Sequence, residues 1–429
     1  MLNNVPDPKP ASLGYPLAEI ASAVAVPGVV LGYYFGVDFI AIWLSLCVVA
    51  AVALGARGKT QMNPVDWGVL LVTTYEIPSL LFSQYRANST FFAWTMAVSA
   101  LLYYFIRLTL RTPRQVVIVS GALAAFGAFL AWSAVSQFGA NLERFQSAGF
   151  IEMVPFRSVL IHVPAPFVLG EWLTLLILLL PFAGVVIVYF WSTHRVLAVL
   201  SFAVPVALTA AMILSCSRAV FWSVVVFLVS LCSLALIYKL TRIRTALIAT
   251  VSAIACVAIL IVSAELIYPG VLDAYAKRDV SQVRSMAGRV SIWKRSRALF
   301  EAHPLWGVGS ANAALFLTST STDDDSGFAS RTFSLPVQVL AEKGAVGASC
   351  YLALLVLLTM QFHRRMRSSV VESWRKLAAA CFASGIAAAV FRDLTYSSLL
   401  EHAPTTLLLV TLIAMLSSDA WWIICESGQ

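Results

Sequence analysis

Residues 168–191, VLGEWLTLLILLLPFAGVVIVYFW, carry a single charged side chain, Glu171. An α-helix rises about 1.5 Å per residue, so a run of this length crosses the roughly 30 Å of hydrocarbon in a bilayer. Apolar runs of similar length recur from one end of the chain to the other. This pattern predicts a membrane protein built from transmembrane helices.

The composition supports that prediction. Of the 429 residues, 60% are hydrophobic and only 12% are charged. Soluble domains carry about 25% charged residues, so this chain has too few charges to cover a water-exposed surface. Residues 1–16 are polar, rich in proline and without a small-residue cleavage pattern, so we expect no cleaved signal peptide. We expect one integral membrane domain over residues 1–429.

The apolar windows predict an all-α, multi-pass protein of about twelve transmembrane helices. The windows lie near 18–36, 38–56, 66–84, 91–108, 115–135, 168–191, 197–216, 219–238, 246–266, 344–362, 376–391 and 404–423. Alternate short connections between them are basic, which the positive-inside rule explains if both termini are cytoplasmic. The basic residues are Arg57 and Lys59; Arg107, Arg111 and Arg114; Arg195; Lys239, Arg242 and Arg244; and Arg364, Arg365, Arg367, Arg375 and Lys376.

That orientation leaves two long segments, about 136–167 and 267–334, on the outer, periplasmic side of the membrane. Loops longer than about 15 residues are commonly functional or disordered. The second segment has seven basic residues and one acidic residue between positions 277 and 297, on the side where Lys and Arg are normally scarce. This excess of charge predicts an anionic partner, and the alternative is a helix resting on lipid phosphates.

Within the basic segment, RSMAGRVSIWKRSRALF at 284–300 predicts an amphipathic helix. Its residues Val290, Trp293, Arg297 and Phe300 recur at helical spacing, so we expect the apolar members to face lipid or the bundle.

No metal site or cofactor is predicted. The seven cysteines lie in or beside apolar runs without the spacing of metal ligands, so they are predicted to be small hydrophobic residues. Asp323, Asp324 and Asp325 form a triplet among Ser, Thr and Gly, which is typical of a solvated loop and only weakly indicates a cation site.

Two arginines lie at the predicted membrane boundary. Arg218, in SCSRAVFW, has no acidic residue nearby in sequence, whereas Arg392 is followed by Asp393. A boundary arginine can be a snorkelling anchor, but a charge between two apolar helices is by default a functional candidate. The planar guanidinium keeps its charge and can hold a phosphate group at two points.

Three motifs resemble those of the superfamily of O-antigen ligases and Wzy-type polysaccharide polymerases. GRVSIWKRSRALFEAHPLWGVG at 288–309 resembles its outer-loop motif, which runs from Gly-Arg through an amphipathic helix to His-Pro-Leu-x-Gly-x-Gly. QVLAEKGAVG at 338–347 is similar to the Leu-Ala-Glu-x-Gly-x-x-Gly sequence that opens the next helix. SCSRA at 215–219 is similar to the Ser-Arg motif of an earlier span.

The resemblance implies a glycosyltransferase of the bacterial inner membrane that takes sugar chains from undecaprenyl diphosphate, without metal or nucleotide. Arg218 and Arg289 match the family's arginines and would hold the diphosphate, and Arg331 would add a third positive group. Glu342 matches the acidic residue of the late helix, for which a helix-start role and a chemical role both remain open.

The chain departs from the ligase pattern at one point. Ligases of this family have a His-Asn pair about nine residues before the conserved Glu, whereas this chain has Phe333 and Ser334 there. This departure favours a polymerase. The densest cluster of alternative acid or base groups is Asp393, Glu401 and His402, although Asp393 could pair with Arg392 and His402 could cap a helix. His162 and Glu265 are further candidates.

The expected function is therefore a polymerase that joins undecaprenyl-diphosphate-linked oligosaccharide units at the periplasmic face, with a gum-type exopolysaccharide as one product. An O-antigen ligase acting on lipid A core is an alternative, and a flippase for lipid-linked oligosaccharides is an alternative of another class. Expected partners are membrane lipids, a flippase and chain-length regulators. No nucleic-acid partner is expected.

Overall fold

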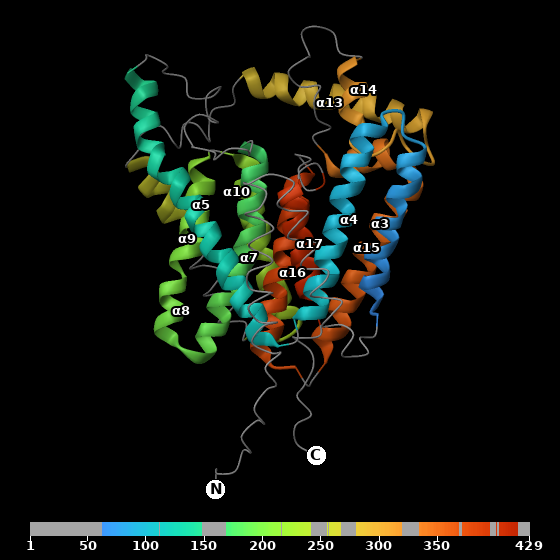
Figure 1. The fold of residues 1–429 in the computed structure, drawn as a ribbon. Coiled ribbons are helices and arrows are strands. Elements are labelled where there is room, and N and C mark those ends of the chain that lie inside the picture. The colour runs from blue at the N-terminus through green and yellow to red at the C-terminus, as the bar shows by residue number, and fades with distance from the viewer. Residues whose placement is uncertain are drawn as a thin grey trace, which may run out of the picture.

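A computed structural model describes residues 62–110, 112–147, 169–215, 217–241, 255, 257–266, 280–319, 334–368, 371–394, 400 and 403–418. Within these ranges every regular element is a helix. The bundle helices run alternately between two ends, and one helix lies across the upper end in Figure 1.

The elements follow the chain in this order: α3 (Pro64–Leu81), α4 (Arg86–Thr109), α5 (Pro113–Ser147), α7 (Leu169–Thr193), α8 (Arg195–Ser201), α9 (Ala203–Leu214), α10 (Arg218–Ile237), α13 (Val280–Ala302), α14 (Ala313–Ser319), α15 (Leu335–Arg367), α16 (Ser373–Asp393) and α17 (Ala403–Ser417). A further helical stretch covers Val257–Leu266. The helix across the upper end is α13, and we call that end the α13 end (Figure 1).

Seven helices of the described part are long and apolar enough to cross a membrane, which makes this a membrane protein with an all-α fold. The first two predicted spans, 18–36 and 38–56, lie outside the described residues. α3 occupies the predicted span 66–84 but is not among the seven, because two carboxylates and two prolines lower its hydropathy. Of the predicted spans 246–266 and 404–423, the described residues include the apolar helical stretches Val257–Leu266 and Thr405–Ser417.

The span predicted near 115–135 agrees with the candidate membrane span Pro113–Ser136. The helix itself continues as α5 to Ser147, so the first part of the predicted outer segment 136–167 is helical. The segment FGANLERFQS has no proline and a single glycine, and nothing in it stops a helix. The other long segment, 267–334, contains α13, as the helical pattern at 284–300 predicted, and also α14, which was not predicted.

The centre of the bundle is α7. Its residues Trp172–Ala183 are buried on every side, which is typical of a helix that is apolar all round. α7 packs on α5, α16 and α17, and α16 presents the small residues Ala378–Ala380, Gly385, Ala388 and Ala389 in its buried surface. Small residues let helix backbones approach closely, which is how helices associate inside lipid.

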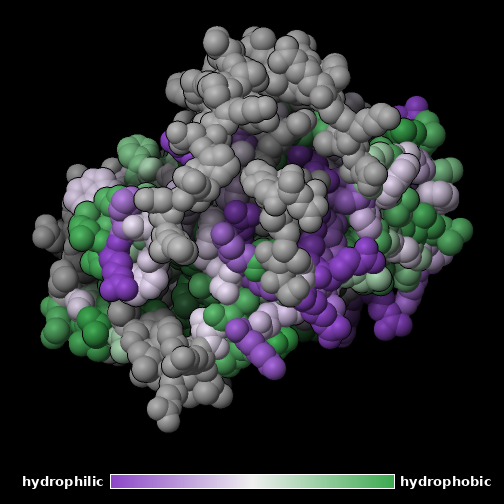
Figure 2. All heavy atoms as spheres, turned by 90° about the horizontal axis from the view of Figure 1, so that it is seen from below, coloured by the Kyte–Doolittle hydropathy of each residue, from purple (hydrophilic) through white to green (hydrophobic). Residues whose placement is uncertain are grey.

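The end opposite α13 is rich in basic side chains. Arg107, Arg195, Lys239 and Arg365 lie at helix termini there, as the alternation of basic connections predicted. Figure 2, which looks onto this end, shows hydrophilic residues over its central part and hydrophobic residues toward its edges.

A buried ion pair joins α3 to α4 at this basic end. Arg107 Nε lies 3.6 Å from Asp66 Oδ1, and both side chains are 5% exposed. The Tyr103 hydroxyl donates to the same Asp66 oxygen at 2.7 Å. Asp66 also closes a capping box with Asn63 at the start of α3, so one carboxylate fixes both the helix start and its neighbour.

Replacing Gly385 with alanine should destabilise the bundle, because a Cβ there would lie 2.4 Å from Pro181 Cγ of α7. Overpacking of this kind costs about 1–3 kcal/mol. Gly121→Ala on α5 is the matched control, since its Cβ would meet nothing within 4 Å and alanine favours a helix. Thermal unfolding in detergent should show a lower midpoint for Gly385→Ala only; equal midpoints for both variants would contradict the α7–α16 contact.

Candidate active site

α15 is broken near its start at Gly344, which has φ +60° and ψ −167°. The backbone N–H groups of Ala345 and Val346 donate out of the helix, to the carbonyls of Pro304 at 2.8 Å and Leu305 at 3.2 Å. The turn that follows α13, residues 303–312, therefore sits beside the break; we call it the docking turn.

The two helix carbonyls released by the break accept hydrogen bonds from the same turn. The Val308 N–H donates to Ala341 at 3.0 Å, and the Gly309 N–H donates to Glu342 at 2.9 Å. Four backbone hydrogen bonds to the docking turn thus satisfy the groups that the break would leave without partners in a buried region.

Close contact between backbones explains why one position in each motif is a glycine. At Gly307, with φ +68°, a Cβ would lie 2.3 Å from the backbone carbonyl of Glu342, and at Gly344 it would lie 2.4 Å from that of Leu305. Any side chain at either position would separate the docking turn from the break. The motifs at 288–309 and 338–347 are therefore two halves of one contact.

A buried polar cluster lies beside this contact. Lys343, which is 1% exposed, donates to Glu76 Oε1 of α3 at 2.5 Å and to Ser310 Oγ of the docking turn at 2.7 Å. Ser310 Oγ donates to the other Glu76 oxygen, Oε2, at 2.7 Å. Ser79 of α3 lies 2.8 Å from the Ser310 hydroxyl. The cluster joins α3, α15 and the docking turn.

Glu342 faces the protein interior and is 3% exposed. Its Oε1 accepts from the backbone N–H of Ala313, the first residue of α14, at 3.3 Å, and Gln338 Nε2 donates to Oε2 at 3.3 Å. Glu342 thus binds the N-terminus of α14. It does not begin α15, which starts at Leu335. These contacts give Glu342 a structural role.

α13, which contains Arg289, lies across the end of the bundle and packs on α15 and α14 (Figure 1). Arg289 is half-buried, and burial lowers the pKa of its guanidinium, although an arginine stays charged. Arg295 Nη1 donates to the Leu317 carbonyl of α14 at 3.2 Å. Arg297 is exposed and pairs with Glu301 at 2.7 Å. The basic residues of this helix therefore differ in their environments.

The side chains of α13 that the structure describes, from residue 288 onward, differ in burial. Among them Ile292 and Ser296 are buried, whereas Val290 and Arg297 are exposed, so contact of Val290 with lipid stays a prediction. The buried stripe of α13 includes a serine, so hydrophobic spacing alone could not identify it.

The other candidate residues of the described part lie at the same end of the bundle. Arg218 is the first residue of α10 and is half-buried, and Arg392 and Asp393 are buried in the last turn of α16. α10 and α16 pack together and both reach the α13 end (Figure 1). The structure thus brings Arg218, Arg289 and Asp393 to one end of the molecule.

Several candidates fall outside the described residues: Arg331, Glu401, His402, His162 and the triplet Asp323–Asp325. Glu265 lies near the end of the helical stretch Val257–Leu266. In the described part of the chain, no group of three His, Cys, Asp or Glu side chains is arranged to hold a metal ion.

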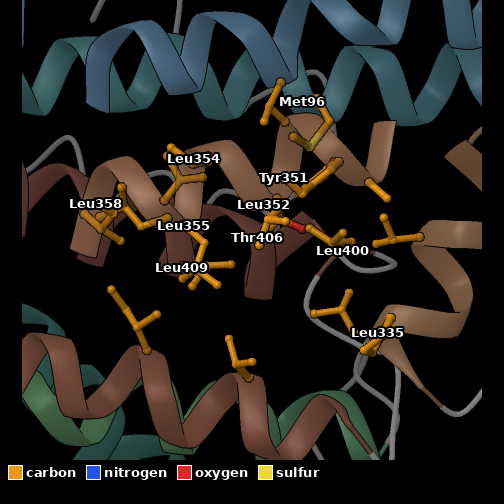
Figure 3. Close-up of a pocket in the computed structure, with 18 of the residues that line it drawn as sticks. Met96, Leu335, Tyr351, Leu352, Leu354, Leu355, Leu358, Leu400, Thr406 and Leu409 are labelled. Atoms are coloured by element: carbon orange, nitrogen blue, oxygen red, sulfur yellow. The ribbon is translucent and has the colours of Figure 1, made fainter. Parts of the chain in front are cut away.

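An apolar cavity of about 450 Å³ lies between α3, α4, α15, α16 and α17. Figure 3 shows Leu352, Leu355 and Leu409 among the side chains around it. Its wall on α15 extends from Leu335, at the α13 end, to Leu358 in the middle of the bundle. The cavity is apolar, and its wall begins at the end of the molecule where the arginines lie.

The sequence interpretation missed this cavity and the buried cluster. A sequence signal existed for the cluster, because Glu76 is an acidic residue in an otherwise apolar stretch and Lys343 interrupts the start of another. Ionisable residues in apolar spans commonly pair with one another. Their sequence separation gave no indication of which pair would form.

Comparison with known proteins agrees with the motifs. Residues 203–352 match the family described as O-antigen ligase, which is about a third of the chain. The matched region contains Arg218, Arg289, the docking turn and the break in α15. A search of curated proteins returned no match. Over residues 203–352 the chain is therefore similar to the family described as O-antigen ligase, in agreement with the resemblance of its motifs.

Proposed function

We propose that this protein is a polysaccharide polymerase of the bacterial inner membrane. It joins oligosaccharide units carried on undecaprenyl diphosphate, and its active site faces the periplasm. The observation that carries the proposal is the placement of the cationic helix α13, with Arg289, across the end of the bundle at which α10 begins with Arg218. Both residues lie within the matched domain.

The proposed reaction is transfer of a sugar chain from one lipid diphosphate to a hydroxyl group of another unit. The hydroxyl oxygen forms a bond to the anomeric carbon of the donor sugar, and the bond between that carbon and the diphosphate oxygen breaks. The lipid diphosphate leaves with the bonding electrons. Fixed guanidinium groups in a poorly solvated site stabilise this developing charge without reorganising.

The hydroxyl proton needs an acceptor, and Asp393 is the candidate in the described part that we favour. It is buried at the end of α16, next to Arg392, at the end of the bundle that holds Arg218 and Arg289. Glu401 and His402 follow in the connection to α17 and remain candidates for the same role. Positioning of the two units and stabilisation of the leaving group would supply the rest of the rate enhancement.

The apolar cavity supports a lipid-linked donor. Inside a membrane a lipid tail gains little from leaving the bilayer, so a protein selects it by shape and close packing. Beyond the break at Gly344, the wall on α15 extends from Ala348 to Leu358, or about 15 Å of helix at 1.5 Å per residue. That length suits the first part of an isoprenoid tail whose diphosphate lies at the α13 end.

A ligase is the second candidate, favoured by the description of the matched family. The polymerase is preferred because Phe333 and Ser334 stand where the ligases have His-Asn, and no histidine occurs from 304 to 362. The two functions differ in their acceptor, since a ligase would transfer the glycan to lipid A core.

Arg289→Ala should reduce high-molecular-weight polymer by about a hundredfold, the usual effect of removing one group that stabilises transition-state charge. Arg218→Ala should act in the same direction. The assay is polymer production in cells that lack the protein and carry each variant, with immunoblots to equalise the amounts in the membrane. Arg297→Ala, on the same helix but exposed and paired with Glu301, is the matched control and should leave polymer unchanged.

The same cells separate the candidate functions. Single lipid-linked units that reach the outer face without being polymerised would support the proposal, whereas units retained on the cytoplasmic face would indicate transport. Loss of glycan from lipid A core, with polymer intact, would indicate a ligase. Normal polymer from both Arg218→Ala and Arg289→Ala would contradict the proposal.

Filling the cavity should weaken the use of long-tailed donors. Ala348 lines the cavity, and Ala348→Phe should lower kcat/KM for an undecaprenyl donor by at least about tenfold, the scale on which an apolar pocket distinguishes one or two methylenes. A donor with a short isoprenoid tail should be affected less. Val356→Phe, on an exposed part of the same helix, is the control. Equal losses with both donors would exclude the cavity as the tail site.

A further inference from the structure

The two ends of α3 hold buried ion pairs with different surroundings. Near its start, Asp66 pairs with Arg107 among residues of the basic end. Near its end, Glu76 pairs with Lys343, where the pair also contacts Ser310 of the docking turn. The Glu76–Lys343 pair therefore links α3 to α15. Through Ser310 it also binds the docking turn, which connects α13 to α14.

Breaking this pair would leave one charge buried without its partner, which is much more costly than removing both. Lys343 is 1% exposed and its ammonium lies 4.3 Å from the centre of the Phe92 ring, so water cannot easily replace Glu76. Loss of Lys343 also removes a donor from the Ser310 hydroxyl. The docking turn would keep its four backbone bonds to the break in α15 and its contacts with α3 and α4, such as the bond from Ser89 Oγ to the Ser310 carbonyl at 2.9 Å, but it would lose the link from Ser310 to the Lys343 charge.

A small movement of the docking turn would have a large effect on Arg289. Arg289 lies 13 residues before Ala302, where α13 ends, which corresponds to about 20 Å along the helix. A tilt of about 5° at that end would displace Arg289 by about 2 Å over this length. A displacement of 1 Å can reduce the rate of an enzyme about a hundredfold.

We propose that Lys343 is a positioning residue: its buried pair with Glu76 holds Ser310 and the docking turn in the break of α15, and so sets the position of Arg289 on α13. Lys343 itself touches no substrate, since its charge is used inside the protein. The inference rests on the proposed function only where it takes a lipid diphosphate as the ligand of Arg289.

The test compares Lys343→Met with Arg107→Met in the full-length protein in lipid nanodiscs. Each variant removes the cation of a buried pair on α3, so both should have lower unfolding midpoints. Hydrogen exchange measured by mass spectrometry should become at least about tenfold faster in peptides covering 303–317 for Lys343→Met only. The Kd for undecaprenyl diphosphate should rise at least about tenfold for Lys343→Met and stay within about twofold for Arg107→Met. A tenfold rise corresponds to a loss of about 1.4 kcal/mol of binding free energy.

A double variant, Glu76→Gln with Lys343→Met, separates positioning from stability. It removes both charges, so the unfolding midpoint should return toward that of the wild type, while the Kd and the exchange of 303–317 should remain altered. A Kd restored together with the midpoint would overturn the proposal, as would an unchanged Kd in Lys343→Met. Binding needs no turnover, so a wild-type protein that binds the lipid diphosphate but makes no polymer would refute the polymerase function alone.

Discussion

The placement of α13 depends on the break in α15 at Gly344, where the docking turn binds. At Gly344 two hydrogen bonds within α15 are replaced by four to residues 304–309, so the two N–H groups and the two carbonyls that the break releases keep hydrogen-bond partners. The exchange requires glycine at 307 and 344, because a side chain at either position would collide with the opposite backbone. A membrane-spanning helix thereby becomes the attachment point of α13, the helix that lies across the end of the bundle.

The buried charged groups of α3 lie near its two ends, and one pair contacts the docking turn. The middle of the bundle is closely packed and apolar around α7. Asp66 fixes the helix at the basic end, whereas Glu76, Lys343 and Ser310 fix it to the docking turn. The apolar cavity begins at the α13 end and extends into the bundle, which is the arrangement that the proposed donor, a charged diphosphate with an apolar tail, would need.

Much of this arrangement could be predicted from the sequence, because it depends on local patterns. Hydropathy predicted the helices from 91 to 238, and the motifs at 215–219 and 288–309 predicted the matched family. Contacts between distant segments could not be predicted. Glu76 and Lys343 are 267 residues apart, and the role of Glu342 at the start of α14 depends on how the docking turn folds back. The buried stripe of α13 includes Ser296 because its surroundings, and not its own spacing, decide which face is covered.

The most direct test of this account is a cryo-electron microscopy structure of the protein in nanodiscs with a lipid-diphosphate-linked oligosaccharide. We expect density for the diphosphate at the α13 end, in contact with the guanidinium groups of Arg218 and Arg289, and density for the isoprenoid tail in the cavity between α15 and α17. A diphosphate bound at the basic end, or one that contacts neither arginine, would contradict it.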